Sequence, residues 1–402
     1  MQDIVILGGG FAGIAAAKHL EKSLRKSCRI TLIDKHPYHL FTPSLYEVAT
    51  SEEPRGNIAI PFTEIFEKHI HCLPATVTKI DTKKQLIHVK ENNKMQTIHY
   101  DFLLLALGSE PAYYNIPGLK AYSVALKNVQ DALMIKNKIV TMCCKEGACN
   151  KKVKLIIGGG GFSGTELAAE MLSYKDTLAK LHHLDKNCLD ITIIQGSDRL
   201  LKELDNHVSE IAQKRMQGPS VHFAFGGHIT KVTQQSVFTD NNKEYPYDIL
   251  IWTGGVKAND ILEESNLPVN KRGQVMVNNF LQVNGFENIF AAGDNTQYID
   301  TKTNTFAPTV AQVAEEEGKT AGENIIRKIK QKPLLPYSYK HFGYVVPLRG
   351  RFAVAELMNN MHFDGLSGWI LQQLVFLRYL LSILSLPKAI RRWTTFEENL
   401  QQ

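Results

Sequence analysis

Long runs of basic residues are missing from this 402-residue chain, and so is a charged leader at its start. The formal net charge of +6 is spread along the sequence, and no stretch holds five or more consecutive Lys or Arg residues. This excludes the concentrated positive surface on which nucleic-acid binding depends. The first residues follow a strand pattern and lack the features of a secretion signal or a transit peptide. We therefore expect a chain that folds in the cytoplasm.

Cysteine is scarce and unevenly placed. The six cysteines are consistent with a reducing compartment. None lies between Cys28 and Cys72, and none follows Cys188. Cys144 and Cys149 are separated by four residues, but their Lys-flanked stretch is typical of a surface connection. The sequence therefore contains no strong candidate for a redox-active cysteine pair.

The sequence contains the same pattern of strands, turn and helix twice. Each copy has an apolar strand, a glycine-rich turn, a helix, a second apolar strand and, later, a closing strand that ends in glycine. In the first copy these parts are residues 4–7, 8–13, 14–24, 29–33 and 100–108. In the second copy they are residues 154–157, 159–164, 165–172, 190–194 and 247–254. One Gly-x-Gly-x-x-Gly motif is weak evidence, whereas two copies in the same context are strong evidence for dinucleotide binding.

The glycines of such a turn have separate tasks. The first permits the tight turn, the second lets the backbone approach a pyrophosphate, and the third lets the helix pack on the strand. The helix N-terminus then faces the phosphates. These glycines are Gly8, Gly10 and Gly13 in the first copy and Gly159, Gly161 and Gly164 in the second.

The residue that ends the second strand distinguishes the two copies. Asp34 stands where a carboxylate accepts hydrogen bonds from ribose hydroxyls, and Gln195 takes the matching place in the second copy. An amide keeps a hydrogen bond but does not repel the 2′-phosphate of NADPH. Arg199 lies close enough in sequence to partner such a phosphate. We therefore expect the second copy to bind NADH and also to admit NADPH; the alternative is that Gln195 binds NADH alone and that selectivity is set elsewhere.

A third motif indicates how the copies are joined. Residues 288–294 resemble the second FAD motif of the glutathione-reductase-like superfamily, which implies that Asp294 contacts the ribityl chain of FAD. That superfamily inserts its NAD domain into its FAD domain. We expect an α/β fold of two Rossmann-like domains plus a C-terminal membrane-associating helical region. The expected parts are an FAD domain at 1–117 and 259–330, an NAD(P)H domain at 118–258 and a membrane-anchoring region at 331–402.

Within that superfamily the chain resembles the type II, non-proton-pumping NADH:quinone oxidoreductases. The resemblance rests on residues 38–50, 106–109, 252–256 and 308–314, which occur in the family's order. It implies a respiratory-chain enzyme that passes a hydride from NADH to non-covalent FAD and then two electrons to a membrane quinone. It also implies a homodimer, bound peripherally at the cytoplasmic face of the inner (cell) membrane, with no metal.

The resemblance also implies the site residues. Glu166 and Gln312 are the expected catalytic residues, and Gln312, Glu315 and Glu316 the expected quinone contacts, although Glu316 stands where the family often has Gln. The patterns Ser163-x-x-Glu166 and Thr309-x-x-Gln312 also read as capping boxes, which would be purely structural. The further expected cofactor contacts are Phe11, Ala12, Lys35, Ala106, Gly108, Gly254 and Ala311, together with Glu166 and Gln312.

Two related chemistries are disfavoured by missing cysteines. Disulfide reductases of the superfamily need a cysteine pair soon after the first glycine motif, and sulfide:quinone oxidoreductases need a cysteine late in the chain. A soluble flavoprotein that binds NAD(P)H and serves a protein partner remains an alternative. The C-terminal segment discriminates between that alternative and a membrane enzyme.

Residues 366–386 are nearly all apolar, close to the roughly 20 residues that span a bilayer. We expect Pro387 to end this helix, with basic residues after it. The segment could span the membrane, be a buried core or dimer helix, or lie in the membrane surface. Arg378 within the segment would cost about 2.5–3.5 kcal/mol at the bilayer centre. Arg378, Ser382 and Ser385 form one polar strip, and the interfacial location is therefore favoured.

Overall fold

The structure is a computed structural model of the chain. It describes residues 1–24, 27–50, 58–67, 69–144, 152–300, 304–340, 342–357 and 361–400, with side chains up to residue 394. The stretch that joins Cys144 to Cys149 lies outside the described residues.

The first copy of the repeat folds as a five-stranded parallel sheet. Residues 4–7 of its β1 strand are apolar and buried, as is typical of a parallel sheet that is covered on both faces. The helices α1 (Phe11–Leu24) and α9 (Ala311–Ile329) pack closely on each other, and a Cβ added at Gly318 would lie 2.1 Å from the backbone oxygen of Ala12. The strand order is β21 (Ile289–Ala291), β9 (Phe102–Leu105), β1 (Gln2–Leu7), β2 (Cys28–Asp34) and β5 (Ile70–Pro74).

The second copy builds an equivalent parallel sheet. Its strand order is β11 (Val124–Ala125), β18 (Ile249–Trp252), β12 (Val153–Gly158), β13 (Leu189–Gln195) and β14 (Val221–Phe225). Its helices are α5 (Val129–Cys143), α6 (Phe162–Leu181) and α7 (Asn206–Met216). The expected α/β class with two Rossmann-like folds is confirmed.

The two folds are joined by a short antiparallel pair. β10 (Ser109–Pro111) leaves the first sheet and pairs with β19 (Val256–Ala258), which leaves the second. The strand β21, which completes the first sheet, comes after the whole second sheet in the chain. This order is the insertion that the motifs predicted, while the domain boundaries themselves stay a prediction.

Small elements fill the remaining connections. The short helical segments are η1 (Thr42–Ser44), α2 (Leu45–Thr50), α3 (Phe62–Ile65), α4 (Leu119–Tyr122) and α8 (Ile261–Glu264). The antiparallel strands are β3 (Tyr38–Leu40) with β4 (Ala59–Pro61), β6 (Thr76–Asp81) with β7 (Leu86–Glu91) and β8 (Lys94–His99), and β15 (Ile229–Val232) with β16 (Ser236–Thr239) and β17 (Glu244–Pro246). Two minor pairs are β20 (Val275–Met276) with β22 (Thr296–Gln297), and β23 (Ile299–Asp300) with β24 (Thr305–Phe306).

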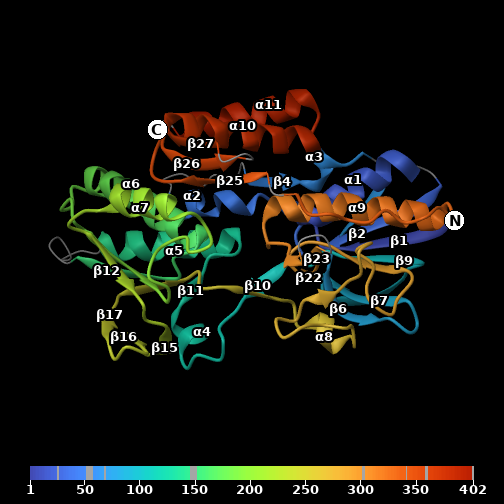
Figure 1. The fold of residues 1–402 in the computed structure, drawn as a ribbon, viewed down its shortest axis with the longest axis horizontal. Coiled ribbons are helices and arrows are strands. Elements are labelled where there is room, and N and C mark those ends of the chain that lie inside the picture. Colours follow the sequence, from blue (N-terminus) through green and yellow to red (C-terminus); the bar gives the residue numbers. More distant parts are fainter. Residues whose placement is uncertain are drawn as a thin grey trace.

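The C-terminal region lies over one side of the molecule (Figure 1). Its antiparallel strands β25 (Gly343–Pro347), β26 (Ala353–Leu357) and β27 (Met361–Gly365) carry two helices, α10 (Leu366–Ile383) and α11 (Leu386–Leu400). The expectation of one helix ended by Pro387 is wrong, because Pro387 lies in the first turn of α11. Proline is tolerated there because that backbone N–H has no partner within the helix.

Candidate functional site

The first glycine-rich turn is shaped to leave an open space above α1. Gly8 has a φ of +106°, and a Cβ there would lie 2.1 Å from the Ala106 backbone oxygen. A Cβ at Gly13 would lie 1.9 Å from the Gly8 oxygen, whereas a Cβ at Gly10 would meet nothing within 4 Å. Gly8 and Gly13 are therefore required by packing, and Gly10 borders free space at a helix N-terminus. This geometry fits the pyrophosphate of a dinucleotide.

The second turn repeats this geometry. Gly159 has a φ of +113°, and a Cβ there would lie 2.8 Å from the backbone nitrogen of Gly254. A Cβ at Gly164 would lie 1.9 Å from the Gly159 oxygen, and a Cβ at Gly161 would meet nothing within 4 Å. Two equivalent cradles, one in each fold, thus leave open space at a helix N-terminus.

The strand-end residues Asp34 and Gln195 make the same backbone contact. Asp34 Oδ2 accepts from the Gly9 amide at 2.7 Å, and Gln195 Oε1 accepts from the Gly160 amide at 2.8 Å. Gln195 therefore preserves the contact that a carboxylate would make to the turn. Its Nε2 donates to Ser197 Oγ at 2.7 Å. The second polar atom of the side chain is therefore a hydrogen-bond donor, whereas the second oxygen of a carboxylate would be an acceptor.

Arg199, which the sequence offers as a partner for a phosphate, makes contacts within its own loop. Its Nη2 donates to the backbone oxygens of Lys202 and Leu204, at 3.2 and 3.4 Å. The guanidinium therefore secures the loop after β13.

Asp294 is contacted by Ser109 of the first fold and by Lys127 of the second. Ser109 Oγ donates to Asp294 Oδ2 at 2.6 Å, and Lys127 Nζ donates to Ser109 Oγ at 2.9 Å. The same Lys127 nitrogen is 3.9 Å from Asp294 Oδ2. Lys127 carried no sequence signal, because its role depends on how the two folds dock.

The other expected cofactor contacts cluster around these turns. Ala12 is buried between the first turn and α9, where a Cβ at Gly293 would come within 3.2 Å of it. The Gly108 amide donates to Asn295 Oδ1 at 3.1 Å, and Lys35 is exposed beside Asp34. Ala311 begins α9 and is partly buried.

Glu166 faces an acidic residue of the first fold. It is partly buried in the first turns of α6, and burial together with nearby Glu47 raises its pKa well above the ordinary value. Glu47 is buried on α2 and accepts a hydrogen bond from Tyr46 Oη at 3.0 Å. The capping box predicted for Ser163 is wrong, because α6 is capped at Gly161 without a side-chain bond. Glu166 thus lies where the two folds meet.

The quinone residues predicted on α9 differ in environment. Gln312 is partly buried in the first turn, and the capping box predicted for Thr309 is wrong because α9 is capped at Val310 without a side-chain bond. Burial, with nearby Glu315, raises the pKa of Glu316.

Glu315 is buried and ion-paired. It binds Lys319 Nζ at 2.6 Å and Arg378 Nη2 at 3.5 Å. Arg378, expected on a polar strip of an isolated helix, is therefore matched by an acid on α9. This pairing lowers the cost of a charge in the apolar segment.

A cavity of about 490 Å³ opens between α1, α9 and α10. Phe11 and Tyr379 contribute aromatic rings to its lining, with ring centroids 4.9 Å apart, and Glu315 and Lys319 contribute charged groups. The cavity therefore combines an aromatic wall with charged groups beside the C-terminal helix.

A buried histidine connects the aromatic residues of this cavity to the first glycine-rich turn by hydrogen bonds. His39 Nδ1 lies 2.9 Å from the Gly9 oxygen, and Tyr379 Oη lies 2.7 Å from His39 Nε2. Burial lowers the pKa of His39 to about 4, so the ring is neutral. Nδ1 then donates to the Gly9 carbonyl, and Nε2 accepts from Tyr379. Sequence reasoning missed both residues, because they are 340 positions apart.

The outer face of the C-terminal helices is apolar. Among the described residues, α10 is the one helix long and apolar enough to cross a membrane, and about a third of it is buried. Its inner side contributes Phe376, Tyr379 and Leu380 to the main hydrophobic core. A helix with one packed and one exposed side suits a membrane surface better than a membrane crossing. The large exposed side chains are Leu366, Ile370, Leu374, Val375 and Leu381 of α10 and Leu386 and Ile390 of α11.

Known proteins share this architecture. Residues 2–318 match the family described as pyridine nucleotide-disulphide oxidoreductase. A demethylphylloquinone reductase (NdbB) of Synechocystis is 30% identical over 93% of this chain and 91% of its own length. A type II NADH:quinone oxidoreductase of Haemophilus influenzae is 25% identical over 89% of this chain and 88% of its own.

The fold is also that of a solved enzyme. The structure of NDH2 from Plasmodium falciparum in complex with NADH has a TM-score of 0.87 and 19% identity, and the match covers 98% of this chain and 97% of that one. With the two glycine cradles and the inserted fold, the match over residues 2–318 settles the family. The chain belongs to the pyridine nucleotide-disulphide oxidoreductase family.

Proposed function

We propose that this protein is a membrane-associated NADH:quinone oxidoreductase of the non-proton-pumping type that works in a respiratory chain. The observation that carries the proposal is the pair of open cradles, at Gly10 and Gly161, together with a helix that has an exposed apolar face. Two cradles provide for FAD and NADH, and the apolar face gives access to a membrane quinone. The names of the curated relatives, which are quinone reductases, support the same reaction.

The first fold would hold FAD non-covalently. The turn at Gly8, Gly10 and Gly13 would receive its pyrophosphate, Asp34 a ribose and Asp294 the ribityl chain. When bound, FAD supplies the chemistry of accepting a hydride and releasing electrons singly or in pairs. The protein contributes position and electrostatics: the N-terminus of α9, which carries Gln312, favours negative charge that develops nearby.

The second fold would hold NADH, with Gln195 at the adenosine ribose. Reduction of a quinone by NADH takes up one proton from solution. Glu166 supports this balance, because burial and nearby Glu47 raise its pKa and favour the protonated carboxyl. We assign it the role of holding a proton where the two folds meet.

For the quinone we propose the side of the first fold that faces α10. Gln312, Glu315 and Glu316 are the proposed contacts on α9, and the aromatic wall of the neighbouring cavity suits a flat ring. Glu315 is already ion-paired with Lys319 and Arg378, so its contribution would come through that network.

The same proposal includes a place in the cell and an assembly. The exposed apolar residues of α10 and α11 would lie in the membrane surface, with Lys388 and Arg391 nearby in sequence to meet anionic head groups. We propose peripheral attachment at the cytoplasmic face of the inner (cell) membrane, as a homodimer. Light scattering of the detergent-solubilised protein measures the assembly directly.

The function is tested by a single assay. The purified protein should be yellow and oxidise NADH rapidly only when a short-chain quinone is present, with the flavin absorbance bleaching and then recovering. If NADH bleaches the flavin and quinone does not restore it, the quinone assignment is wrong and the alternative, a protein acceptor, takes its place. If a folded preparation cannot bind FAD, the whole proposal is wrong.

Gln195→Glu should shift the cofactor preference towards NADH. The new carboxylate can still accept from the Gly160 amide, but its second oxygen replaces a donor with a negative charge. That charge repels the 2′-phosphate of NADPH. A change worth about 1–3 kcal/mol corresponds to a fall of roughly ten- to a hundredfold in kcat/KM for NADPH relative to NADH.

Steady-state rates with both cofactors check this result. Arg199→Ala is the matched control, because its guanidinium binds loop carbonyls, and the ratio should stay as in the wild type. An unchanged ratio in Gln195→Glu would show that selectivity is set elsewhere.

A further inference from the structure

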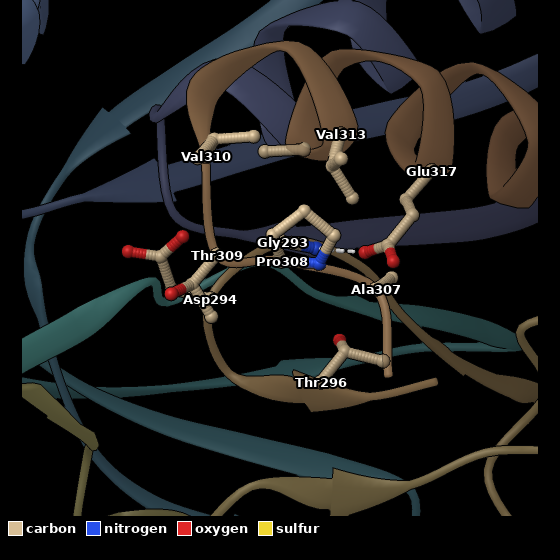
Figure 2. A pocket seen from close by; sticks show the side chains of 10 residues that line it. Gly293, Asp294, Thr296, Ala307, Pro308, Thr309, Val310, Val313 and Glu317 are labelled. Atoms are coloured by element: carbon tan, nitrogen blue, oxygen red, sulfur yellow. Dashed lines mark hydrogen bonds between the residues drawn. The ribbon is translucent and has the colours of Figure 1, made fainter. Parts of the chain in front are cut away.

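A buried carboxyl that the proposed reaction leaves unused lies behind Asp294. Glu317, in the second turn of α9, is 3% exposed, and its Oε2 accepts from the Gly293 amide at 2.7 Å. Figure 2 shows this contact, with Asp294 on the other side of the same turn. Gly293 has a φ of +81°, a conformation that depends on glycine. A side chain of α9 therefore fixes the turn that presents Asp294.

The groups that face Glu317 are acids and phenols. Glu316 lies on the same helix and Asp294 across the turn, while Tyr298 and Tyr337 feel its charge from the segments packed beside it. Burial is the main reason that the pKa of Glu317 rises to about 8, with Asp294 and Glu316 adding to the rise and the Gly293 amide opposing it. Near neutral pH the carboxyl is therefore protonated and neutral.

Ionisation would change the charge at the cofactor. The turn at 293–294 sits opposite the first helix, because a Cβ at Gly293 would come within 3.2 Å of Ala12. An FAD pyrophosphate on the first glycine turn would thus lie near Asp294 and Glu317. A carboxylate at Glu317 would add negative charge beside a dianion and an acid in a partly buried site, where like charges repel strongly.

We propose that Glu317 is a positioning residue for bound FAD, holding the 293–294 turn while protonated and weakening FAD binding when it ionises. The proposal rests on Asp294 as an FAD contact. The neutral acid is both an acceptor for the Gly293 amide and a group that adds no charge.

The test is FAD release from the holoenzyme, followed as the recovery of free flavin fluorescence after dilution, between about pH 7 and about pH 9.5. In the wild type the dissociation constant should rise roughly tenfold over this range. Glu317→Gln keeps the acceptor oxygen and cannot ionise, so FAD should bind as in the wild type near neutral pH and stay bound at high pH. Glu317→Leu has no acceptor and should bind FAD at least tenfold more weakly at every pH.

Each outcome of this experiment decides one part of the proposal, either positioning or ionisation. A flat wild-type profile, or Glu317→Gln following the wild type to high pH, overturns the role of ionisation. Tight binding by Glu317→Leu overturns positioning, and if that variant does not fold, Glu317→Gln still decides the role of ionisation. Glu323→Gln, on the same helix but paired with His19 and Arg327, is the matched control and should leave the profile unchanged.

Failure of this proposal differs from failure of the proposed function. A yellow protein that does not reduce quinone still reports on Glu317 through flavin release. A protein without FAD at any pH overturns both.

Discussion

Gly164→Ala is expected to slow NADH oxidation strongly while FAD stays bound to the first fold. The added Cβ would lie 1.9 Å from the Gly159 oxygen and 2.7 Å from Thr253 Oγ1, so the turn and α6 cannot both keep their places. Overpacking of this kind costs about 1–3 kcal/mol or more, and the displaced turn would no longer receive a pyrophosphate. Stopped-flow reduction of the flavin by NADH should slow on the order of a hundredfold.

Gly161→Ala separates packing from ligand approach. A Cβ at Gly161 meets nothing within 4 Å of the chain, so the melting temperature should stay as in the wild type. The same methyl group occupies the space that the pyrophosphate needs, and NADH should bind roughly tenfold more weakly. Normal NADH binding by both variants would place the nicotinamide cofactor elsewhere.

The double variant Ile370→Glu with Leu374→Glu is expected to release the protein from lipid vesicles. Both side chains are about half exposed on the outer face of α10. Burial of each in lipid contributes roughly 1.5–3 kcal/mol, and the new charges oppose insertion. Binding to vesicles that contain anionic lipid should therefore fall at least about a hundredfold in a co-sedimentation assay.

Substitution is a better test than truncation, because α10 also supplies Phe376 and Tyr379 to the core. Removal of the helix would expose Phe41, which packs against both rings. The double variant should keep its rate with a water-soluble quinone, since the inner side of the helix is unchanged. Met95→Glu, an equally drastic change at an exposed site on β8, is the control and should bind vesicles normally. Vesicle binding by the double variant would show that this face is not the membrane contact.

The sequence by itself determined the two dinucleotide folds. The tasks of Gly8 and Gly13, and of Gly159 and Gly164, are local, because each glycine is required by a backbone atom of the same turn or of the closing strand. The order of strand, turn and helix can be predicted from the sequence for the same reason, because it too depends on residues that are close together in the chain. The place of Gln195 followed too, because the end of the second strand always reaches the turn.

Local pattern misled where a terminus was decided by its surroundings. Ser163 and Thr309 match capping boxes, yet α6 and α9 start without side-chain caps. Pro387 was expected to stop a helix and instead lies at the start of one. Propensity describes what a segment can do in isolation, and the neighbouring elements decide among the options.

Only the tertiary structure brought distant groups together. Lys127 reaches Asp294 because the two folds dock, and Tyr379 reaches His39 because the C-terminal helix packs on the first glycine turn. Glu317 became a group of interest only when its contact with Gly293 was visible. The physical reason is common to all three pairs: local sequence fixes backbone shape over a few residues, whereas contacts between remote side chains, and the pKa shifts that follow from their burial, arise only from the packing of whole elements.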